Sequence, residues 1–134
     1  MKVLKPLVLL VALLATFLLT GWHKAEKESN AALKQHVIVM LKFKAQPDKG
    51  TVAISALKAL LNEVKEEPHF ISIKLHVDPN DPTNILLYEE WEDASYYNGA
   101  HMNTRHLLGF MNDSRNFLTG PPEISFWEVK HMVE

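Results

Sequence analysis

The order of patterned segments along this 134-residue sequence predicts an α+β domain, with one antiparallel sheet and helices on one face of it. Three observations support this fold class. Four segments carry the β-branched residues or the two-residue alternation of β-strands. One long segment and two shorter ones have the apolar spacing or the capping residues of helices. Clusters of Pro, Gly, Asp and Asn separate these segments and predict turns.

The first two predicted elements are a strand and a helix. Residues 36–44 (HVIVMLKFK) are mostly apolar on both faces, which indicates a central strand rather than an edge strand. A turn follows, in which Asp48 or Thr51 can cap the next element. Apolar residues then recur every three or four positions over residues 51–66, the pattern of a helix packed by one face. Pro68 ends this helix, because its ring disfavours helical backbone in the preceding residue.

The middle of the sequence predicts a hairpin. Residues 70–77 alternate, with Ile71, Ile73, Leu75 and Val77 expected on one face. Residues 84–92 form the partner strand, and the Asp-Pro-Asn-Asp-Pro cluster between the two strands predicts the turn.

The last third predicts two short helices and a fourth strand. Asp93 is expected to cap a helix over residues 93–100, and Thr104 a second one over residues 105–116. A Gly-Pro-Pro break precedes the strand at residues 123–132. The resulting order, β-α-β-β-α-β, is that of a ferredoxin-like fold.

Covering the second face of the predicted sheet requires a partner. Two helices are too few to cover all the large apolar residues of the strands, among them Val39, Ile73, Trp91 and Trp127. A second copy of the chain is the simplest cover, so we expect a homodimer.

The N-terminus resembles a leader, with two lysines followed by an unbroken apolar run over residues 6–20. It is expected to be a cleaved secretory signal or an uncleaved membrane anchor; a buried core helix is the alternative. Both leader interpretations place the domain outside the cytoplasm, in the periplasm, secreted, or anchored to the membrane through this segment alone. The predicted organisation is a leader (1–25, with 6–22 as the membrane segment), a polar spacer (26–35) and one α+β domain (36–134).

Composition excludes several classes of protein. There are no cysteines, so disulfide scaffolds, thiolate metal sites and cysteine nucleophiles are excluded. The formal net charge is −2, and several lysines lie in or beside the leader, so the domain lacks the basic character of a nucleic-acid binder.

Histidines are the first candidates for chemistry. His101 and His106 are five residues apart, which is not a same-face spacing on a helix unless a break at Asn103-Thr104 brings them together. They are either catalytic bases, or ligands of a metal or haem, or ordinary capping or hydrogen-bonded packing residues. His76 lies on the polar face of its predicted strand, where solvent exposure is the simpler interpretation. No metal site is predicted.

Aromatic and acidic residues cluster around the last two predicted strands. The aromatic residues either form core or line a pocket for a flat organic ligand; they are Tyr88, Trp91, Tyr96, Tyr97 and Trp127. The neighbouring acidic run alternates faces on a strand, which favours a solvated rim over a carboxylate dyad; it comprises Glu89, Glu90, Glu92 and Asp93.

These residues carry a resemblance. Residues 84–106 read NILLYEEWEDASYYNGAHMNTRH. This segment resembles the antibiotic biosynthesis monooxygenase domain in three features: a strand that ends in Tyr-Glu-x-Trp, a helix capped by an acid, and a next helix that starts with Thr-Arg-His. Glu67-Pro68 and the Gly-Pro-Pro break are similar as well, and the resemblance extends over about residues 35–129. Leu87 stands where anthrone-oxidising relatives carry Asn, and His69-Phe70 stands where many members have Gly.

The resemblance implies a dimeric α+β barrel and oxygenation of a phenol, quinol or anthrone without a cofactor. In that chemistry the deprotonated substrate itself reduces O2, and the protein supplies a dry pocket, a base and hydrogen-bond donors. The expected catalytic residues are His106 or His101 as base, with Trp91 and Tyr97 orienting the reactants; the expected substrate-binding residues are Tyr88, Leu87, Phe110 and His76. Two alternatives remain: a non-catalytic domain that binds haem or a hydrophobic small molecule, and a structural or regulatory dimer with a closed pocket.

Overall fold

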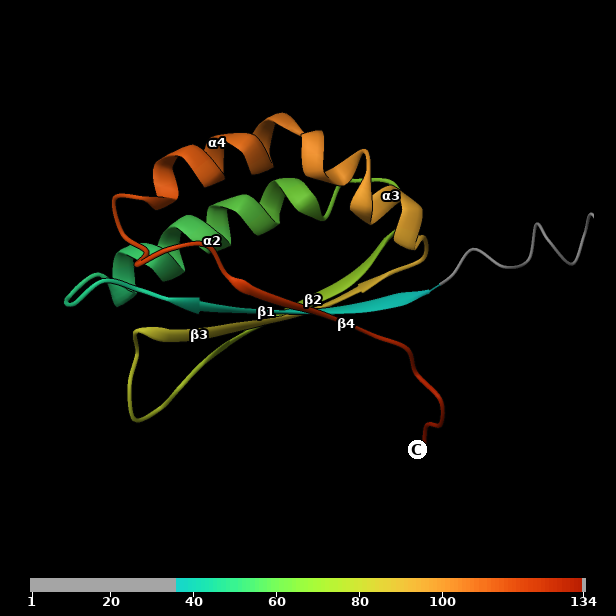
Figure 1. The fold of residues 1–134 in the computed structure, drawn as a ribbon, viewed down its shortest axis with the longest axis horizontal. Coiled ribbons are helices and arrows are strands. Elements are labelled where there is room, and N and C mark those ends of the chain that lie inside the picture. The colour runs from blue at the N-terminus through green and yellow to red at the C-terminus, as the bar shows by residue number, and fades with distance from the viewer. Residues whose placement is uncertain (1–35, 134) are drawn as a thin grey trace, which may run out of the picture. The chain divides into compact units, whose positions relative to one another are not determined.

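The computed structural model describes residues 36–133, which form a four-stranded antiparallel sheet with the helices on one face (Figure 1). The strand order is β2-β3-β1-β4, so β1 is an inner strand, as predicted. The ferredoxin-like α+β fold is therefore confirmed. In chain order the elements are β1 (Val37–Lys44), α2 (Gly50–Val64), β2 (Phe70–Val77), β3 (Asn84–Trp91), α3 (Ala94–Asn98), a 3-10 turn (His101–Asn103), α4 (Arg105–Ser114) and β4 (Glu123–Trp127).

Register places the two ends of β1 in different surroundings. In the β1–β3 pair, Val37 lies opposite Trp91 at one end and Lys44 opposite Asn84 at the other. The predicted β2–β3 hairpin is confirmed. A register shift between Phe70 and Ser72 leaves Ile71 41% exposed, so the predicted facing is wrong at that residue; a bulge of this kind interrupts the alternation of side chains.

Several predicted element ends are wrong. The helices expected to reach residues 66, 100 and 116 end at Val64, Asn98 and Ser114, and the strand expected to reach residue 132 ends at Trp127. Pairing explains the shorter strand: Trp127 lies opposite Ile38, and β1 extends only one residue further, so residues after 128 have no β1 backbone beside them.

The predicted caps have mixed outcomes. Asp93 caps α3, because its Oδ1 accepts the backbone N–H groups of Ser95 and Tyr96. Neither Asp48 nor Thr51 caps α2: Lys49 holds the N-cap position without a side-chain bond, and Asp48 takes a positive φ of 63° in the preceding turn. Thr104 holds the N-cap position of α4, but its hydroxyl donates to the His101 carbonyl instead.

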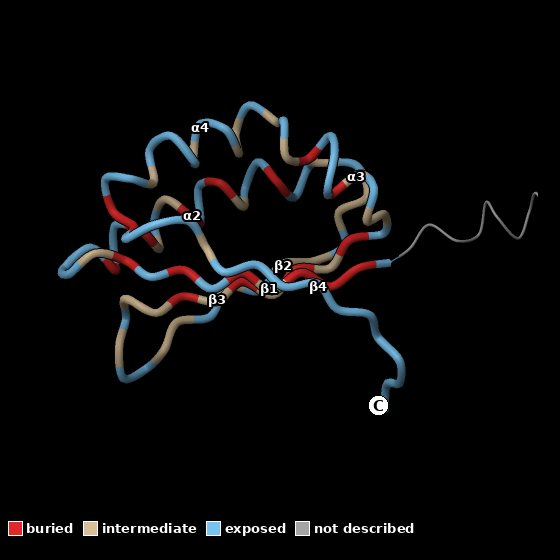
Figure 2. Tube along the Cα trace, viewed as in Figure 1, coloured by how far each residue is buried: buried red, intermediate tan, exposed pale blue. Residues whose placement is uncertain are grey.

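The core lies between the sheet and α2, where the inward faces of β1 and β3 are buried (Figure 2). Val39 and Trp91 are fully buried there within one chain, and Ile73 packs against the same core. The sequence predicts that two helices cannot cover Val39, Ile73, Trp91 and Trp127 together. Of these four residues, Trp127 is the one that is left 56% exposed. Among the described helices none is long and apolar enough to cross a bilayer, and the predicted leader and spacer lie outside the described residues.

Candidate active site

Glu67 lies in the turn between α2 and β2. Its backbone N–H donates to the carbonyl of Val64 (3.0 Å), which tightens the chain after the last residue of α2, and Pro68 prevents the helix from continuing. Its side chain is only 5% exposed. A buried carboxylate needs hydrogen bonds or opposite charge to compensate for the lost water.

Three side chains supply that compensation. The Tyr96 hydroxyl donates to Oε2 of Glu67 at 3.1 Å, and Nδ1 of His101 lies 2.9 Å from the same oxygen. Nε2 of His106 contacts the other oxygen, Oε1. One buried carboxylate thus joins the two histidines.

A change of backbone direction makes this possible. His101 starts the 3-10 turn, Thr104 is extended (φ −67°, ψ 146°), and α4 begins at the next residue. The chain therefore breaks where the sequence allowed it, at Asn103-Thr104. Without the break, a five-residue spacing would put His101 and His106 on different faces of one helix.

A second carboxyl, Glu89, is buried close by on the inward face of β3. Its Oε2 accepts a hydrogen bond from the Trp91 indole N–H (3.0 Å). Burial raises the pKa of Glu89 to about 7; the Trp91 bond opposes this shift, and the charge of Glu67 adds to it. The solvated rim predicted for the acidic run is therefore wrong at Glu89, because β3 is an inner strand whose inward face is covered by helices.

Aromatic rings enclose His101. The Tyr97 ring stacks on the imidazole at 4.9 Å between centroids, and the Trp91 ring lies 4.7 Å away. Burial, and next the charge of Glu89, raise the pKa of the Tyr97 hydroxyl above its ordinary value. Tyr97 therefore stays a phenol at neutral pH and can donate a hydrogen bond.

A cavity of about 370 Å³ adjoins this group, bordered by β1, β3, α4 and the segment before β4. His101 and Tyr97 form part of its wall, and its other lining side chains are mostly apolar. The volume falls in the range of small-molecule pockets. The lining residues are Leu41, Phe43, Leu60, Leu87, Tyr97, His101, Met102, Leu107, Phe110, Met111, Ser114, Arg115, Leu118, Gly120, Pro121, Pro122 and Ile124.

The residues predicted for the site fall into three groups. Those that line the cavity are Tyr97, His101, Leu87 and Phe110. Trp91 and His106 do not line it, but each touches a partner of His101: Trp91 packs on the imidazole ring and His106 contacts Glu67. Tyr88 and His76 lie elsewhere. Tyr88 donates to Oε1 of Glu90 (2.8 Å), and His76 is exposed beside a second cavity, of about 560 Å³.

Sequence reasoning missed Glu67 as the partner of the histidines. The residue stands 34 positions from His101 and 39 from His106 along the chain, so no spacing rule connects them. The available signal was a Glu-Pro pair at a helix end, within the segment that carries the family resemblance.

The same geometry shows which side chains could bind a cofactor or a metal ion. Nδ1 of His101 is engaged by Glu67, so Nε2 is the ring nitrogen left to meet a ligand or a cofactor. Within residues 36–133, no group of three or more His, Asp and Glu side chains is arranged to hold a metal ion.

His69 has an unusual backbone for its residue type. Its φ of 64° lies in the left-handed region, where a side chain costs about 1 kcal/mol or more and glycine costs little. Glycine would therefore adopt this backbone at a lower cost than histidine does. The His69 ring packs on Tyr96 (5.1 Å), and its Nδ1 lies 3.5 Å from Oε2 of Glu92, without hydrogen-bond geometry.

Comparison with known proteins agrees with this fold. Residues 36–113 match the sequence model of the family described as antibiotic biosynthesis monooxygenase. No curated protein matches the sequence.

Solved structures give similar results. PA3566 from Pseudomonas aeruginosa is 22% identical with a TM-score of 0.66, over 72% of this chain and 95% of that one. A putative antibiotic biosynthesis monooxygenase from Nitrosomonas europaea is 18% identical with a TM-score of 0.66, over 72% and 91%. Rv0793 from Mycobacterium tuberculosis is 18% identical with a TM-score of 0.66, over 75% and 100%. At these identities the structures show the fold alone, whereas the family match extends over more than half of the sequence. The chain therefore belongs to the antibiotic biosynthesis monooxygenase family.

Proposed function

We propose that the protein is a monooxygenase that acts without a cofactor on a small aromatic phenol or quinol bound in the cavity. One observation carries the proposal: His101 forms part of an apolar wall while its Nδ1 is bonded to the buried carboxylate of Glu67. A nitrogen base held by a carboxylate beside a dry pocket is the arrangement that removes a proton from a bound hydroxyl.

His101 is the base in this proposal. With the Nδ1 proton donated to Glu67, Nε2 of the neutral ring is the acceptor, and it takes the proton of the substrate hydroxyl. Glu67 then stabilises the imidazolium that forms and fixes the orientation of the ring. His106 meets the other oxygen of Glu67 and is 23% exposed, against 5% for His101, so it connects this carboxylate to solvent.

The surrounding residues supply the environment. Tyr97 offers a phenol that stays protonated, and Trp91 holds the imidazole in place by ring contact. Leu87 and Phe110 provide apolar wall that excludes water, which strengthens every polar interaction inside the pocket.

The electrons come from the substrate. A naphthol, for example, reacts with O2 to give a naphthoquinone and water: one oxygen atom forms a new carbonyl on the ring and the other leaves as water. Four electrons pass from the substrate to O2, and two protons leave with the water. The protein has only to form the phenolate, place O2 beside it and return the proton.

The working unit we propose is a dimer outside the cytoplasm. Proteins of this fold family generally form dimers. Trp127, left 56% exposed at the end of β4, would gain cover from a second copy. The apolar N-terminal segment of the sequence supports export or anchoring.

Oxygen uptake tests the activity. The full chain, stripped of metals, is mixed with naphthols, quinols and anthrones in air, and oxygen consumption is followed above the uncatalysed rate. We expect uptake with at least one class, and a fall of about 10²–10⁴-fold in His101→Ala, the range that a general base contributes. The matched control is His131→Ala, since His131 is exposed near the C-terminus. Equal rates in His101→Ala and wild type would refute the assignment of the base.

A second candidate function is binding without turnover, favoured by the nearly apolar lining around one available imidazole nitrogen. It predicts that a hydrophobic ligand or haem raises the melting temperature while no oxygen is consumed. In the haem case, a Soret shift on titration should disappear in His101→Ala.

A further inference from the structure

The cavity has two ionisable nitrogen side chains in its wall and no acidic one. These two side chains are His101 and Arg115, and no Asp or Glu is among the lining residues. A cationic ligand would therefore find no carboxylate here, whereas an anionic group would find a guanidinium.

Arg115 is only partly engaged by the protein. Its Nε donates to the carbonyl of Asn112 (2.7 Å), and Nη2 contacts Oδ1 of the same residue. Both contacts tie it to the end of α4, yet the guanidinium has five N–H groups, and the others form no hydrogen bond with residues 36–133. Arg115 forms no ion pair with the acidic residues of the described chain.

His101 and Arg115 flank the two ends of one helix. His101 precedes α4 and Arg115 is its C-cap residue, so thirteen residues separate them, ten of which form the helix. At 1.5 Å per residue this helix is about 15 Å long. His101 is buried and Arg115 is exposed, so the cavity has an inner end with a base and an outer rim with a positive charge.

We propose that the ligand of this cavity is an aromatic hydroxy acid whose hydroxyl meets His101 and whose carboxylate is bound by Arg115 at the rim. A guanidinium binds a carboxylate through two parallel N–H groups, which a neutral aromatic ring cannot match. The position of the hydroxyl rests on the proposed function; the selection of an anion by Arg115 rests on the cavity alone.

Equilibrium binding in oxygen-free buffer tests this without any turnover. Three naphthols of similar shape serve as probes for the full chain: 6-hydroxy-2-naphthoate, the uncharged 2-naphthol, and the cationic 6-aminomethyl-2-naphthol. Binding is measured by calorimetry for wild type, Arg115→Gln and Arg105→Gln. Arg105 is the matched control, because it is exposed at the other end of α4 and does not line the cavity.

The expected result is an order of affinity. Wild type and Arg105→Gln should bind the carboxylate at least about fivefold more tightly than 2-naphthol and bind the cation most weakly, with the preference shrinking at high salt. Arg115→Gln should bind the carboxylate and 2-naphthol about equally.

Three results would overturn the inference: equal affinity of wild type for all three probes, binding of none of them, or a carboxylate preference that survives in Arg115→Gln. A preference for the carboxylate in a protein that consumes no oxygen would refute the proposed function and leave this inference standing.

Discussion

Two polar clusters lie at opposite ends of the β1–β3 pair, and they use the same chemical groups in opposite ways. Near Lys44 and Asn84 the cluster is open to solvent, and near Val37 and Trp91 it is enclosed by helices and aromatic rings. Both contain carboxylates held by donors. The comparison shows how far removal of water, rather than residue type, decides what an acidic side chain does.

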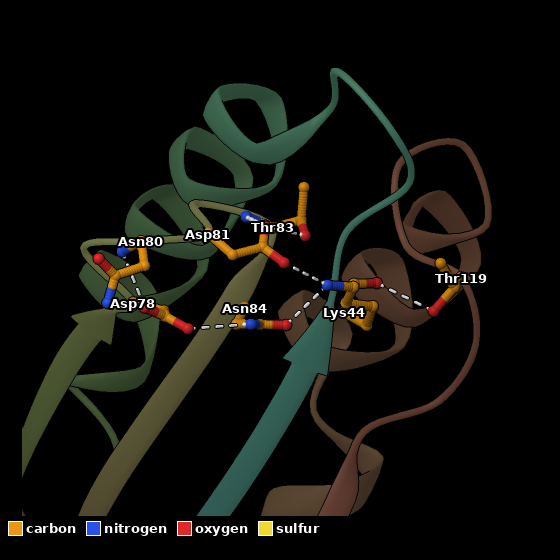
Figure 3. A network of polar contacts seen from close by, with 7 residues as sticks. All are labelled: Lys44, Asp78, Asn80, Asp81, Thr83, Asn84 and Thr119. Atoms are coloured by element: carbon orange, nitrogen blue, oxygen red, sulfur yellow. Dashed lines mark hydrogen bonds and ion pairs between the residues drawn. The ribbon is translucent and has the colours of Figure 1, made fainter.

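The exposed cluster gathers around Lys44 (Figure 3). The Lys44 ammonium donates to Oδ2 of Asp81 and to Oδ1 of Asn84, both at 2.8 Å, and Asn84 donates to Asp78 at 3.0 Å. The Lys44 hydrogen bond is the largest of the contacts that lower the pKa of Asp81 to about 2. The hydrogen bonds to Asp81 stabilise its charged carboxylate, and the surrounding water screens the attraction between this charge and Lys44.

In the enclosed cluster the pKa of a carboxyl is raised instead of lowered. Burial is the main reason that the pKa of Glu89 rises to about 7, although Trp91 donates to it. Glu67 is buried to the same degree as His101 and satisfies three donors at once. A buried acid with a raised pKa is a mark of functional sites. The exposed cluster lacks that burial, although Lys44, Asp78 and Asn84 line the second cavity together with His76.

The largest effect is expected from Glu67→Ala. It leaves Tyr96 and two imidazoles without their acceptor, so the free energy of unfolding should fall by about 3 kcal/mol in urea denaturation. Glu63→Ala, at an exposed position of α2, is the matched control and should stay near wild type. Should Glu67→Ala not fold, Glu67→Gln gives the same direction with a smaller loss. A Glu67→Ala midpoint equal to that of wild type would mean that the enclosed cluster contributes no more to stability than a surface group.

A pH-dependent effect is expected next, from Glu89→Gln. The folded pKa of Glu89, about 7, lies above its value of 4.5 in the unfolded chain. Between these values the unfolded chain loses the proton first, so stability falls as pH rises from 4.5 to 7 and is flat above. The loss amounts to about 3 kcal/mol, and Glu89→Gln should remove it.

The measurement is urea unfolding at pH 4.5 and at pH 8. Relative to wild type, Glu89→Gln should be more stable at pH 8 than at pH 4.5 by about this amount. A difference that does not change with pH would show that the Glu89 carboxyl titrates as an ordinary surface acid.

The smallest effect is expected at the exposed cluster. Lys44→Met should raise the pKa of Asp81 from about 2 toward its ordinary value of 3.8, as followed by NMR titration of its carboxyl carbon. Asp81 stabilises the fold above pH 3.8, and this contribution is lost as pH falls through 2. Because the pair is exposed and screened, the urea midpoint at pH 7 should hardly move, and still less at high salt. A large drop in that midpoint would contradict the contrast between the two ends of the sheet.

The sequence by itself determined the order of the elements, the central position of β1, the hairpin and the Asp93 cap. Each depends on local information: side-chain period, β-branched content, or a capping residue within three positions of its partner. It also indicated His101, Tyr97, Leu87 and Phe110, which line the cavity; the resemblance carried His101 and Tyr97.

Only the tertiary structure brought Glu67 to both histidines and buried Glu89 beside Trp91, and only it placed Arg115 and His101 in the wall of one cavity. These contacts join residues far apart along the chain or depend on which neighbours exclude water. Side-chain period reports the face on which a residue lies but not what packs over that face. For this reason the elements could be read from the residues in order, whereas the acid–base partners of the site appear only once the chain has folded.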